Sequence, residues 1–532
     1  MIPTSTNVAV DVKSKTPADV DAVVLFIAQG VKAIDAEALS AQERVAGERL
    51  IRAGAVQGKP REFAFDLVES GKGFRRVYVI GLGEEKKLTT ETLRQAAGAA
   101  AKAFRKHRMT RVALALPQAD TLAAPEAADA IATGLLLAAF HFREFKGAAK
   151  KFDDGVRKDG ALRVTILSED DQVTAAVNRA RIICEGQNFA RTIASRPGNV
   201  VNPPALARVA QDMARDAGLK FRVMDEKEMG RLGMGGILAV GSGSAHPPRM
   251  IVMEWNGAPR STTSKSTSKA ATARGQRPRG ISPNLAAPLL VVGKAITFDT
   301  GGISIKPADK MGEMIFDKCG AMAVLGLMYA VAKLKLPINV VGILASAENM
   351  PSGTSYRPGD ILKMYNGVTV EVTNTDAEGR LVLGDALAWG IETYQPAAVV
   401  DLATLTGGCV IALGHTQAGL MSNNDSLVAE LQQAADRSAE KIWRLPVGKD
   451  QRDAIKSNHA DIINSAGRAG SPITAGAFLS YFVPRDNSVP WAHFDIAGVA
   501  DTDKELPYYP KGATGWGVRM LINWVAARAA HF

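Results

Sequence analysis

The sequence predicts an α/β protein with two domains, a smaller N-terminal α/β domain and a larger C-terminal α/β domain whose central sheet is mainly parallel. Three observations lead to this prediction. Apolar, β-rich runs alternate with helical runs along most of the chain, a pattern typical of parallel strands joined by helices. The chain has 532 residues, which is too long for a single small module. Its composition, 46% hydrophobic and 22% charged, is that of a globular protein that can bury a large core.

The N-terminal domain is predicted to span residues 1–175. A run rich in Ala, Lys and Arg predicts a helix over 91–107, and shorter β-rich runs predict strands at 23–27, 76–80, 111–116 and 162–167. A long helix is expected over 172–194, ending before Arg196-Pro197-Gly198 because Pro and Gly stop a helix. Asn202-Pro203-Pro204 then opens another helix. We therefore place the domain boundary at the long helix.

The C-terminal domain, predicted over 176–532, repeats the α/β rhythm more strongly. Its strands are expected at 236–240, 250–254, 289–298, 338–346 and 397–402. Its helices are expected at 314–334, 381–393 and 427–442. Several of these strands are continuously apolar, which indicates a sheet that is buried on both faces.

A basic insertion, residues 259–287, interrupts this domain. It is dense in Ser, Thr, Lys, Arg, Gly and Pro and is therefore expected to be a mobile surface loop. Six of the ten excess positive charges of the chain lie within 259–280. This charge suggests an alternative, additional role in sequence-independent nucleic-acid binding. However, the insertion has no aromatic residue for base stacking and no base-reading pattern, so a nucleic-acid partner is not expected.

The cysteines and the first residues indicate the compartment. Cys184, Cys319 and Cys409 are odd in number and far apart, so they predict neither a disulfide framework nor a metal knuckle. The N-terminus lacks the basic and apolar regions of a signal peptide, and no apolar run approaches the roughly 20 residues of a membrane span. We expect a cytoplasmic protein that does not associate with membranes.

Carboxylates and lysines stand out in apolar, glycine-rich sequence. The motifs of zincins, α/β-hydrolases and P-loop proteins are absent from the sequence. Instead, a predicted core strand contains Lys294 and is followed by Asp299 and two glycines, with Lys306 close behind. Strand ends often carry charge that faces water, so this segment alone does not distinguish a site from a solvated turn. Asp317 is expected in the first turn of the apolar helix that follows, where its carboxylate must be paired, protonated or bound to a metal.

The segment Asn374-Thr375-Asp376-Ala377-Glu378-Gly379-Arg380-Leu381 is the strongest signal. If it is extended, Asp376, Glu378 and Arg380 project to one side, because side chains alternate along a strand. Two carboxylates then converge beside a guanidinium, and their repulsion must be relieved by a shared proton or by cations. Divalent ions shared among carboxylates are a common solution in hydrolytic sites. The alternative is a surface cluster of salt bridges, which contributes little to stability.

The segment from Asn374 to Leu381 resembles the signature of the M17 leucyl aminopeptidase family. The segment from Val292-Gly293-Lys294 to Asp317 resembles the other metal-binding segment of the family, with the same internal spacing. Further matches are Asp401-Leu402-Ala403-Thr404-Leu405-Thr406-Gly407, Trp491-Ala492-His493-Phe494-Asp495-Ile496-Ala497-Gly498 and Gly512-Ala513-Thr514-Gly515. The N-terminal domain resembles the family only in its α/β pattern, and the family implies a macro-like fold for it. No clear phosphate-binding loop supports a separate ligand-binding role there.

The resemblance implies a metal-dependent aminopeptidase, a hydrolase that releases N-terminal residues from short peptides by means of a water activated by two metal ions. It implies a preference for leucine and similar apolar residues. The implied metal ligands are Lys294, Asp299, Asp317, Asp376 and Glu378, with Asp299 and Glu378 bridging the two ions. Oxygen-rich ligands with one neutral amine favour zinc or manganese, with cobalt or magnesium as alternatives in the exchangeable site.

The resemblance also implies two catalytic residues and a group of substrate-binding residues. Lys306 is expected to stabilise the oxyanion, and Arg380 to hold a bicarbonate ion that shuttles the proton. Substrate contacts are implied for Met314, Asn374, Thr404, Leu405 and Gly407. Met314 is equally consistent with core packing, and His493 and Trp491 are expected to be structural. The family further implies a homohexamer and a substrate with a free α-amino group.

Overall fold

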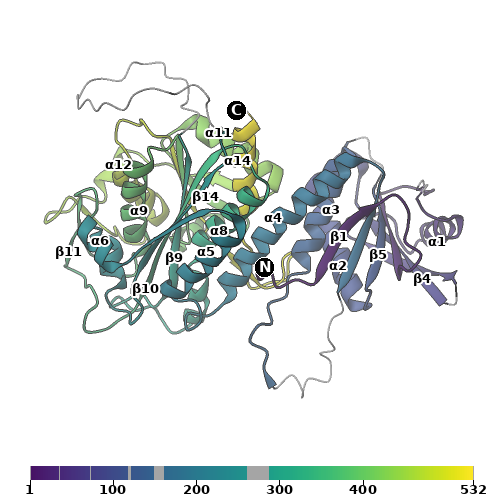
Figure 1. Cartoon of the computed structure of the whole chain (residues 1–532), viewed down its shortest axis with the longest axis horizontal. Helices are drawn as coiled ribbons and strands as arrows, with labels where there is room; N and C mark the ends of the chain where they lie inside the picture. The colour runs from purple at the N-terminus through teal and green to yellow at the C-terminus, as the bar shows by residue number, and fades with distance from the viewer. Residues whose placement is uncertain are drawn as a thin grey trace. The chain divides into compact units, whose positions relative to one another are not determined.

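The computed structural model describes residues 2–34, 36, 38–71, 73–117, 121–148, 161–259 and 287–530. These residues divide into two compact units (Figure 1). The N-terminal unit contains Ile2–Thr192 and Thr502–Thr514, and the C-terminal unit contains Ile193–Asp501 and 515–530. Both units are α/β, as predicted. The basic insertion lies outside the described residues except at its ends.

The N-terminal unit is built on a six-stranded sheet in the order β1-β6-β5-β2-β4-β3. Neighbouring strands are parallel except for the edge pair β4 and β3. The strands are β1 (Val8–Lys13), β2 (Ala22–Ile27), β3 (Phe63–Ser70), β4 (Gly73–Gly81), β5 (Arg111–Ala115) and β6 (Leu162–Leu167). The four predicted strands are confirmed as β2, β4, β5 and β6.

Helices cover both faces of this sheet. They are α1 (Ala41–Arg52), α2 (Thr90–Lys106), α3 (Ala124–Ala138) and the start of α4 (Asp171–Ser195), with the short 3-10 helix η1 (Glu85–Lys87). Alternate residues of β2 serve the two faces: Val24 and Phe26 pack in the core beside α2 and α3, whereas Val23 and Leu25 pack in the core beside α1. The predicted helix 91–107 is confirmed as α2.

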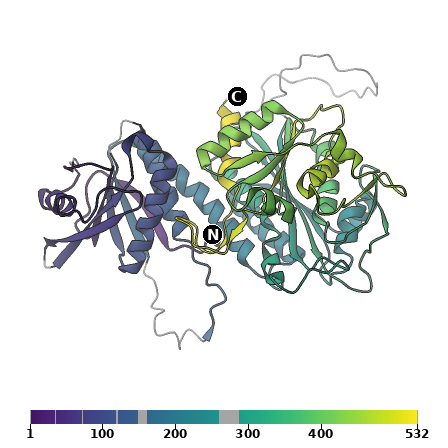
Figure 2. The same cartoon turned by 180° about the vertical axis from the view of Figure 1, so that it is seen from behind.

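A late segment of the chain, Thr502–Thr514, returns to the N-terminal unit and is drawn in yellow in Figure 2. Tyr508 lies in the same core as α2. Gly98 in α2 allows the close approach, because a Cβ atom there would lie 2.5 Å from the Pro507 carbonyl oxygen. Buried Arg191 in α4 donates through Nε to the Ala513 carbonyl at 2.9 Å. The local sequence pattern contains no sign of this long-range return.

The C-terminal unit is built on an eight-stranded sheet in the order β15-β14-β17-β13-β9-β10-β8-β7. Its central strands β17, β13, β9 and β10 are mutually parallel, as is the edge pair β14 and β15, and the other neighbours are antiparallel. The strands are β7 (Lys220–Met224), β8 (Arg249–Asn256), β9 (Leu289–Asp299), β10 (Asn339–Asn349), β13 (Ala398–Ala403), β14 (Ala418–Ser422), β15 (Ile442–Arg444) and β17 (Trp491–Asp495). A small sheet is formed by β11 (Ile361–Lys363), β12 (Thr369–Glu371) and β16 (Ile462–Ile463). The strands β18 (Asp501–Thr502) and β19 (Gly512–Ala513) pair with each other at the two ends of the segment that returns to the N-terminal unit.

Two apolar helices, α8 (Cys319–Lys333) and α9 (Gly379–Tyr394), pack against the central strands β9, β10 and β13. The other helices are α5 (Pro203–Ala217), α6 (Glu226–Leu232), α7 (Gly235–Gly241), η3 (Met311–Phe316), α10 (Gly407–Leu413), α11 (Asp425–Ser438), α12 (Lys449–Asp453), α13 (Ser471–Leu479), η4 (Ser480–Phe482) and α14 (Val518–Ala530). Asn202 caps α5 by accepting the amide N–H of Ala205 at 3.0 Å, as its position before two prolines predicts.

The prediction of a strand at 236–240 is wrong, because these residues lie in the helix α7. A short apolar run is compatible with either structure, and here a distant side chain decides. The buried carboxylate of Asp385 in α9 accepts the amide N–H of Ile237 at 2.9 Å and so satisfies the first turn of α7. Burial raises the pKa of Asp385 to about 7, against the effect of the backbone amides that donate to it.

The segment Met311–Lys333 has 23 residues, and its most apolar 18-residue window has a mean hydropathy of 1.5, so by length and composition alone it could cross a membrane. In the folded chain 83% of its most apolar window is buried inside the protein. It consists of η3 and α8, and nearly every residue of α8 is buried. A helix that is apolar on all sides in this way is a core helix.

Candidate metal centre

Strand β9 carries Lys294 and ends with Asp299, two of the candidate metal ligands. Consecutive side chains of a strand point to opposite faces, so Gly293 faces α8 and Lys294 faces α9. A Cβ atom on Gly293 would lie 2.4 Å from the Cα atom of Ala321 in α8. A Cβ atom on Gly379, at the start of α9, would lie 2.7 Å from Cδ of Lys294. Because residue 379 is a glycine without a side chain, the buried Lys294 side chain has room to extend into the site.

Lys294 binds three acceptors from three separate segments. Its Nζ atom lies 2.8 Å from Asp317 Oδ1, 2.8 Å from Glu378 Oε1 and 2.8 Å from the Thr404 carbonyl oxygen. The lysine side chain is 3% exposed, so water does not compete for these contacts. This amine thus contacts two of the predicted metal ligands, Asp317 and Glu378, and the backbone of Thr404, a predicted substrate-binding residue.

Asp299 ends β9, and a tight turn then brings Lys306 back to it. Gly301 and Gly302 have φ values of +86° and +67°, which L-residues with a side chain rarely adopt. The Lys306 amide N–H donates to the Thr300 carbonyl at 2.8 Å, closing the turn. Nζ of Lys306 lies 2.8 Å from Asp299 Oδ2 and also contacts Asp376 Oδ1.

Asp317 does not lie in the first turn of an α-helix, contrary to the prediction. It ends η3, and α8 begins two residues later at Cys319. The Asp317 amide donates to the Met314 carbonyl at 3.2 Å, a 3-10 contact that turns the chain before the helix. Oδ1 of Asp317 accepts the hydroxyl of Thr404 at 2.7 Å, which fixes the carboxylate beside Lys294.

The segment 374–380 is not extended, so the alternation argument made for it is wrong. Residues 375 and 376 form a turn and α9 begins at Gly379, which puts Arg380 in the first helical turn. The turn is stabilised locally because the Asn374 side-chain oxygen accepts the Asp376 amide at 2.9 Å. A turn followed by a helix start brings Asp376 and Glu378 together as effectively as a strand does.

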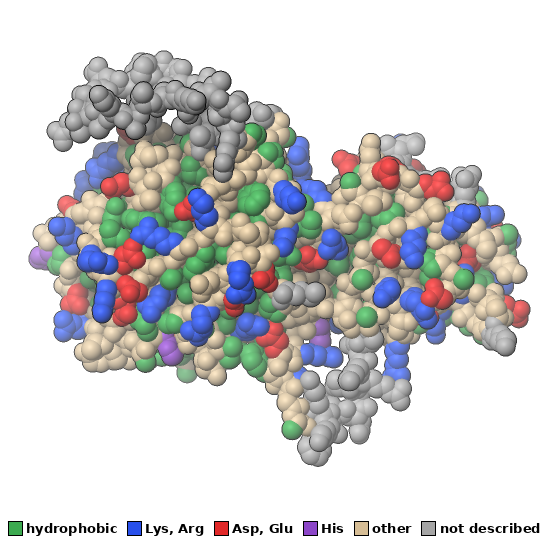
Figure 3. Space-filling model, viewed as in Figure 1, with side chains coloured by type: hydrophobic (Ala, Val, Ile, Leu, Met, Phe, Trp, Pro, Cys, Tyr) green, Lys and Arg blue, Asp and Glu red, His purple; other side chains and the backbone are tan. Residues whose placement is uncertain are grey.

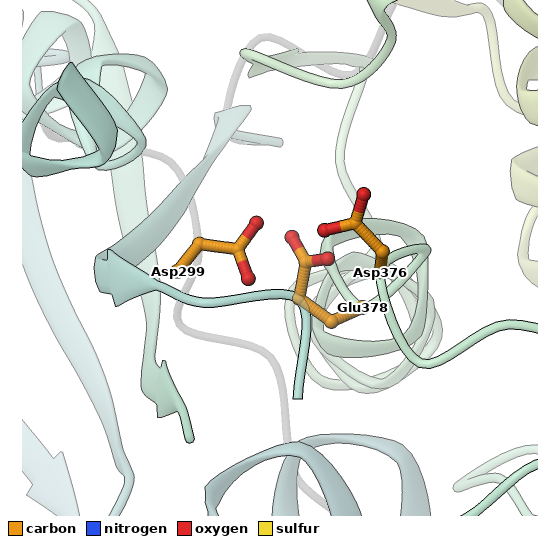
Figure 4. Close-up of side chains that lie close together, drawn as sticks. All are labelled: Asp299, Asp376 and Glu378. Atoms are coloured by element: carbon orange, nitrogen blue, oxygen red, sulfur yellow. The ribbon is translucent and has the colours of Figure 1, made fainter. Parts of the chain in front are cut away.

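Three carboxylates converge from the two segments. Oxygen atoms of Asp299, Asp376 and Glu378 all lie within 4.8 Å of one another. Figure 4 shows Asp299 reaching from the end of its strand towards the other two side chains. With Asp317, which Lys294 joins to Glu378, they form a group of four that we call the carboxylate cluster.

Burial makes the carboxylate cluster electrostatically unusual. Burial, with repulsion from Glu378 and Asp299, raises the pKa of Asp376 to about 7. The pKa of Asp317 is raised to about 8, because burial and the same two carboxylates outweigh Lys294. Burial would lower the pKa of Lys294, but Asp317, Glu378 and Asp299 outweigh it, so that pKa is raised. The pKa of Lys306 is raised in the same way, with Asp299 as its largest charged partner.

The carboxylate cluster fits divalent cations. Four carboxylates face two lysine amines, so the buried site has too little positive charge of its own. Asp317 Oδ2 and Glu378 Oε2 are buried and have no hydrogen-bond partner among the described residues. Such oxygen atoms, together with an amine, suit zinc or manganese. A bound dication also favours the neutral amine that a lysine ligand requires.

Arg380 lies beside this cluster and is 4% exposed. Its Nη1 atom donates to the Asn464 carbonyl at 2.7 Å. Burial lowers the pKa of Arg380 to about 10, although the carboxylates of Glu378 and Asp495 act in the opposite direction. A guanidinium that stays charged in a buried place is suited to a planar anion.

Asn464 is a residue that the sequence analysis missed. Its side-chain oxygen accepts the amides of Thr373 and Asn374 at 2.8 and 3.3 Å, and its Nδ2 atom donates to the Asn374 carbonyl at 2.7 Å. It therefore holds the segment that carries Asp376, while its own carbonyl holds Arg380. An isolated asparagine after the short strand β16 carries no sequence signal that distinguishes it.

The predicted substrate-binding residues lie on three segments. Thr404 and Leu405 follow β13 and Gly407 begins α10, while Met314 is half-buried in η3 and Asn374 precedes the Asp376 turn. The Thr404 carbonyl is used by Lys294, and the Leu405 amide donates to Asp495 Oδ1 at 3.1 Å. These two backbone groups therefore hold the site itself.

His493 and Trp491 form a buried group with Asp401. Nδ1 of His493 lies 2.5 Å from Asp401 Oδ1, and Nε1 of Trp491 donates to Asp401 Oδ2 at 2.7 Å. The side chains of His493 and Asp401 are fully buried. These contacts join β13 to β17, as expected of a structural group.

Fold and site together define an α/β protein with a candidate divalent-metal centre at the carboxyl ends of parallel strands, the kind of centre that hydrolases use. Residues 188–522 match the model for the catalytic domain of the cytosol aminopeptidase family (peptidase M17), and residues 23–149 match the model for its N-terminal domain. The chain therefore belongs to the cytosol aminopeptidase family, whose members are metal-dependent aminopeptidases.

Relatives match over most of their length. A probable cytosol aminopeptidase of Cenarchaeum symbiosum (strain A) is 42% identical over 463 residues, which are 86% of this chain and 87% of that protein. Another, of Azoarcus sp. (strain BH72), is 38% identical over 531 residues, 98% of each chain.

Solved structures show the same architecture. The bottromycin maturation enzyme BotP has 31% identity and a TM-score of 0.80, covering 96% of this chain and 100% of its own, and a complex of BotP with Mn matches equally well. A mutant of tomato leucine aminopeptidase has 29% identity and a TM-score of 0.81, covering 98% of this chain and 97% of its own.

Proposed function

We propose that this aminopeptidase removes leucine and similar apolar residues from the free N-terminus of short peptides with the help of two divalent ions. One observation carries the proposal: a buried lysine amine and four carboxylates from three segments meet in one cluster that has more negative than positive charge. Lys294, Asp299, Asp317, Asp376 and Glu378 are the residues that would hold the ions. When bound, such ions supply Lewis acidity and make a water molecule acidic enough to act near neutral pH.

Lys306 is proposed to bind the oxyanion that develops on the scissile carbonyl. Its side chain is 21% exposed, whereas that of Lys294 is 3% exposed, and it enters the site from a turn. A lysine side chain is ordinarily an ammonium near neutral pH, which is the form that stabilises negative charge. Asp299 and Asp376 orient it until a substrate carbonyl is present.

The specificity is proposed to rest on the free α-amino group and on an apolar pocket. The carboxylate cluster offers acidic partners to an α-amine, and an acetylated N-terminus has no such amine. Met314 is the proposed apolar contact for a leucine side chain, since its flexible thioether adapts to such groups. The Leu405 carbonyl and the Gly407 amide are the proposed backbone contacts of the peptide, and Asn374 a further one. The structure of tomato leucine aminopeptidase among the solved relatives supports the preference.

Zinc or manganese is the proposed metal, and a solved relative in complex with Mn supports the second. We also propose a cytoplasmic location, which the name of the related cytosol aminopeptidases supports. A homohexamer and short peptide substrates follow from the family resemblance.

Figure 3 shows Lys and Arg side chains interspersed with Asp and Glu on the face in view, a distribution that does not favour a phosphate-binding surface there.

Removing the metal is expected to abolish activity reversibly. A sample dialysed against a chelator should lose hydrolysis of leucyl fluorogenic amide and regain it with added Mn²⁺ or Zn²⁺, because the carboxylate cluster alone cannot polarise the carbonyl or acidify water. A panel of aminoacyl amides, with N-acetyl-leucyl amide as the blocked control, tests the specificity in the same assay. Undiminished hydrolysis by a sample shown to be metal-free by elemental analysis would contradict the proposal.

Arg380 is proposed to hold a bicarbonate ion that transfers the proton. Replacing it with alanine (Arg380→Ala) is expected to lower kcat by about 10²-fold, the lower end of what general acid-base catalysis contributes. Added bicarbonate should restore part of this loss, and sodium nitrate at equal ionic strength should not. Arg380→Lys is the matched variant, since it keeps the charge but loses the two parallel hydrogen bonds. A kcat of Arg380→Ala that does not respond to bicarbonate would exclude this role.

A further inference from the structure

Asn349, the last residue of β10, lies beside the end of β9 at an irregularity in the sheet. Ala347 pairs with Ile296, and the next pair is Asn349 with Asp299, so β9 contains one extra residue between the two pairs. A bulge of this kind bends a strand and changes the direction of the side chains that follow it. The irregularity therefore sets Asp299 opposite Asn349, whose side chain is fully buried.

The amide group of Asn349 donates two hydrogen bonds to two different segments. Its Nδ2 atom lies 2.8 Å from Asp299 Oδ1 and 3.1 Å from the Thr375 carbonyl oxygen. Both partners can only accept, so chemistry fixes which end of the amide faces them. The main-chain carbonyl of Asn349 accepts hydrogen bonds from the Thr300 backbone amide at 3.0 Å and from the Thr300 hydroxyl at 2.8 Å.

These contacts distinguish the two oxygen atoms of Asp299. Oδ1 receives the Asn349 amide and also the Gly301 amide at 2.9 Å, whereas Oδ2 faces Lys306 at 2.8 Å. Two N–H donors occupy the lone pairs of Oδ1, which leaves Oδ2 as the oxygen that points to the reaction site. Asn349 thereby makes one oxygen of Asp299 a structural atom and the other a ligand atom.

The second hydrogen bond reaches the segment that carries Asp376. The Thr375 carbonyl also accepts the hydroxyl of buried Tyr356 at 2.6 Å, and the Thr375 hydroxyl donates to the Gly301 carbonyl at 2.6 Å. No strand pairing joins this segment to the end of β9 among the described residues. The side chains of Asn349 and Thr375 thus supply the connection that a sheet would otherwise provide.

We propose that Asn349 is a positioning residue that sets the spacing between Asp299 and Asp376 and directs Oδ2 of Asp299 to the metal. The inference rests on the proposed function, because it assigns Asn349 as the hydrogen-bond partner that orients Asp299, a proposed metal ligand. An aspartate here would set a further negative charge beside Asp299, and a leucine would fill the space without donating. Gly302 is part of this arrangement, since a Cβ atom there would lie 2.8 Å from the Asn349 side-chain oxygen.

The test compares Asn349→Leu with wild type by chelator-competition titration of Mn²⁺, and measures thermal unfolding of the metal-free proteins. Loss of an outer-shell partner typically costs about 10- to 100-fold in metal affinity, and a weakening of this size is expected here. Activity at low Mn²⁺ should fall with it and recover partly in excess Mn²⁺, a rescue that a merely structural role does not predict. If Asn349→Leu does not fold, Asn349→Ser, which keeps one donor, should show a smaller weakening.

Asn423→Leu is the matched control. Asn423 also joins two strand ends of the C-terminal unit, donating to the Val489 carbonyl at 3.1 Å and accepting the Trp491 amide at 2.8 Å. It should lower the unfolding temperature and leave the Mn²⁺ affinity unchanged. A wild-type protein that binds neither Mn²⁺ nor Zn²⁺ would overturn the proposed function itself. If wild type binds Mn²⁺ and Asn349→Leu binds it with the same affinity, this inference alone is overturned.

Discussion

Glu378→Gln is expected to reduce the hydrolysis of leucyl amide by about a thousandfold or more, while the protein remains folded. The substitution keeps the shape of the side chain but removes the charge at the centre of the cluster, where Glu378 contacts Lys294 and lies within 4.8 Å of Asp299 and Asp376. Loss of metal-based stabilisation of the transition state costs several kcal/mol, and each 1.4 kcal/mol corresponds to a factor of about ten in rate. Steady-state kinetics, with bound metal measured by elemental analysis, test this.

Glu392→Gln is the control for this variant. Glu392 lies on the same helix, α9, and is exposed. It should retain both metal content and activity. Unchanged kinetics of Glu378→Gln at full purity would remove Glu378 from the proposed ligands, and loss of its circular dichroism signal would point to a folding role. Asp376→Asn is expected to behave like Glu378→Gln, since it removes a neighbouring charge from the same cluster.

Lys306→Met is expected to lower kcat by about 10²- to 10³-fold with the metal still bound. The thioether replaces the stem of the lysine but cannot donate to an oxyanion, and loss of one such donor has about this effect. Removing an ammonium from beside Asp299 and Asp376 leaves more negative charge for cations. Metal affinity should therefore stay equal or rise, which separates this variant from the ligand variants.

Lys310→Met is the matched control, because Lys310 is exposed in the segment that follows the same turn. Its kcat should equal that of wild type. A Lys306→Met enzyme with wild-type kcat would refute the oxyanion role. A lower metal content would instead indicate that Lys306 holds the site together.

The sequence predicted the α/β class because its main elements are regular and strongly apolar. The continuously apolar runs that became β9, β10 and β13 are buried in the middle of the sheet, where burial on both faces permits only such residues. Prediction failed for 236–240, a short apolar run whose helix is stabilised by Asp385, nearly 150 residues away. The return of Thr502–Thr514 to the N-terminal unit likewise depends on partners distant in sequence.

The site residues could be named from sequence although one argument for them was wrong. Asp376 and Glu378 converge through a turn and a helix start, not through strand alternation. The residue types still carried the signal, because charged groups in apolar, glycine-rich sequence need partners wherever they lie. Asn349, Asn464 and Tyr356 had no such signal, since single polar residues of these kinds occur throughout any chain.

By itself, the sequence predicted the apolar strands and the charged groups that follow them, because polarity and periodicity are local properties, and its family resemblance named the candidate site residues. Only the tertiary structure decided that Lys294 passes Gly379 to reach Asp317, Glu378 and Thr404, and that Asn349 joins the Asp299 and Asp376 segments. These contacts depend on the order of the strands and on the one extra residue in β9. Strand order is set by packing among segments far apart in the chain, as where β9 lies between β10 and β13, and local pattern does not encode it.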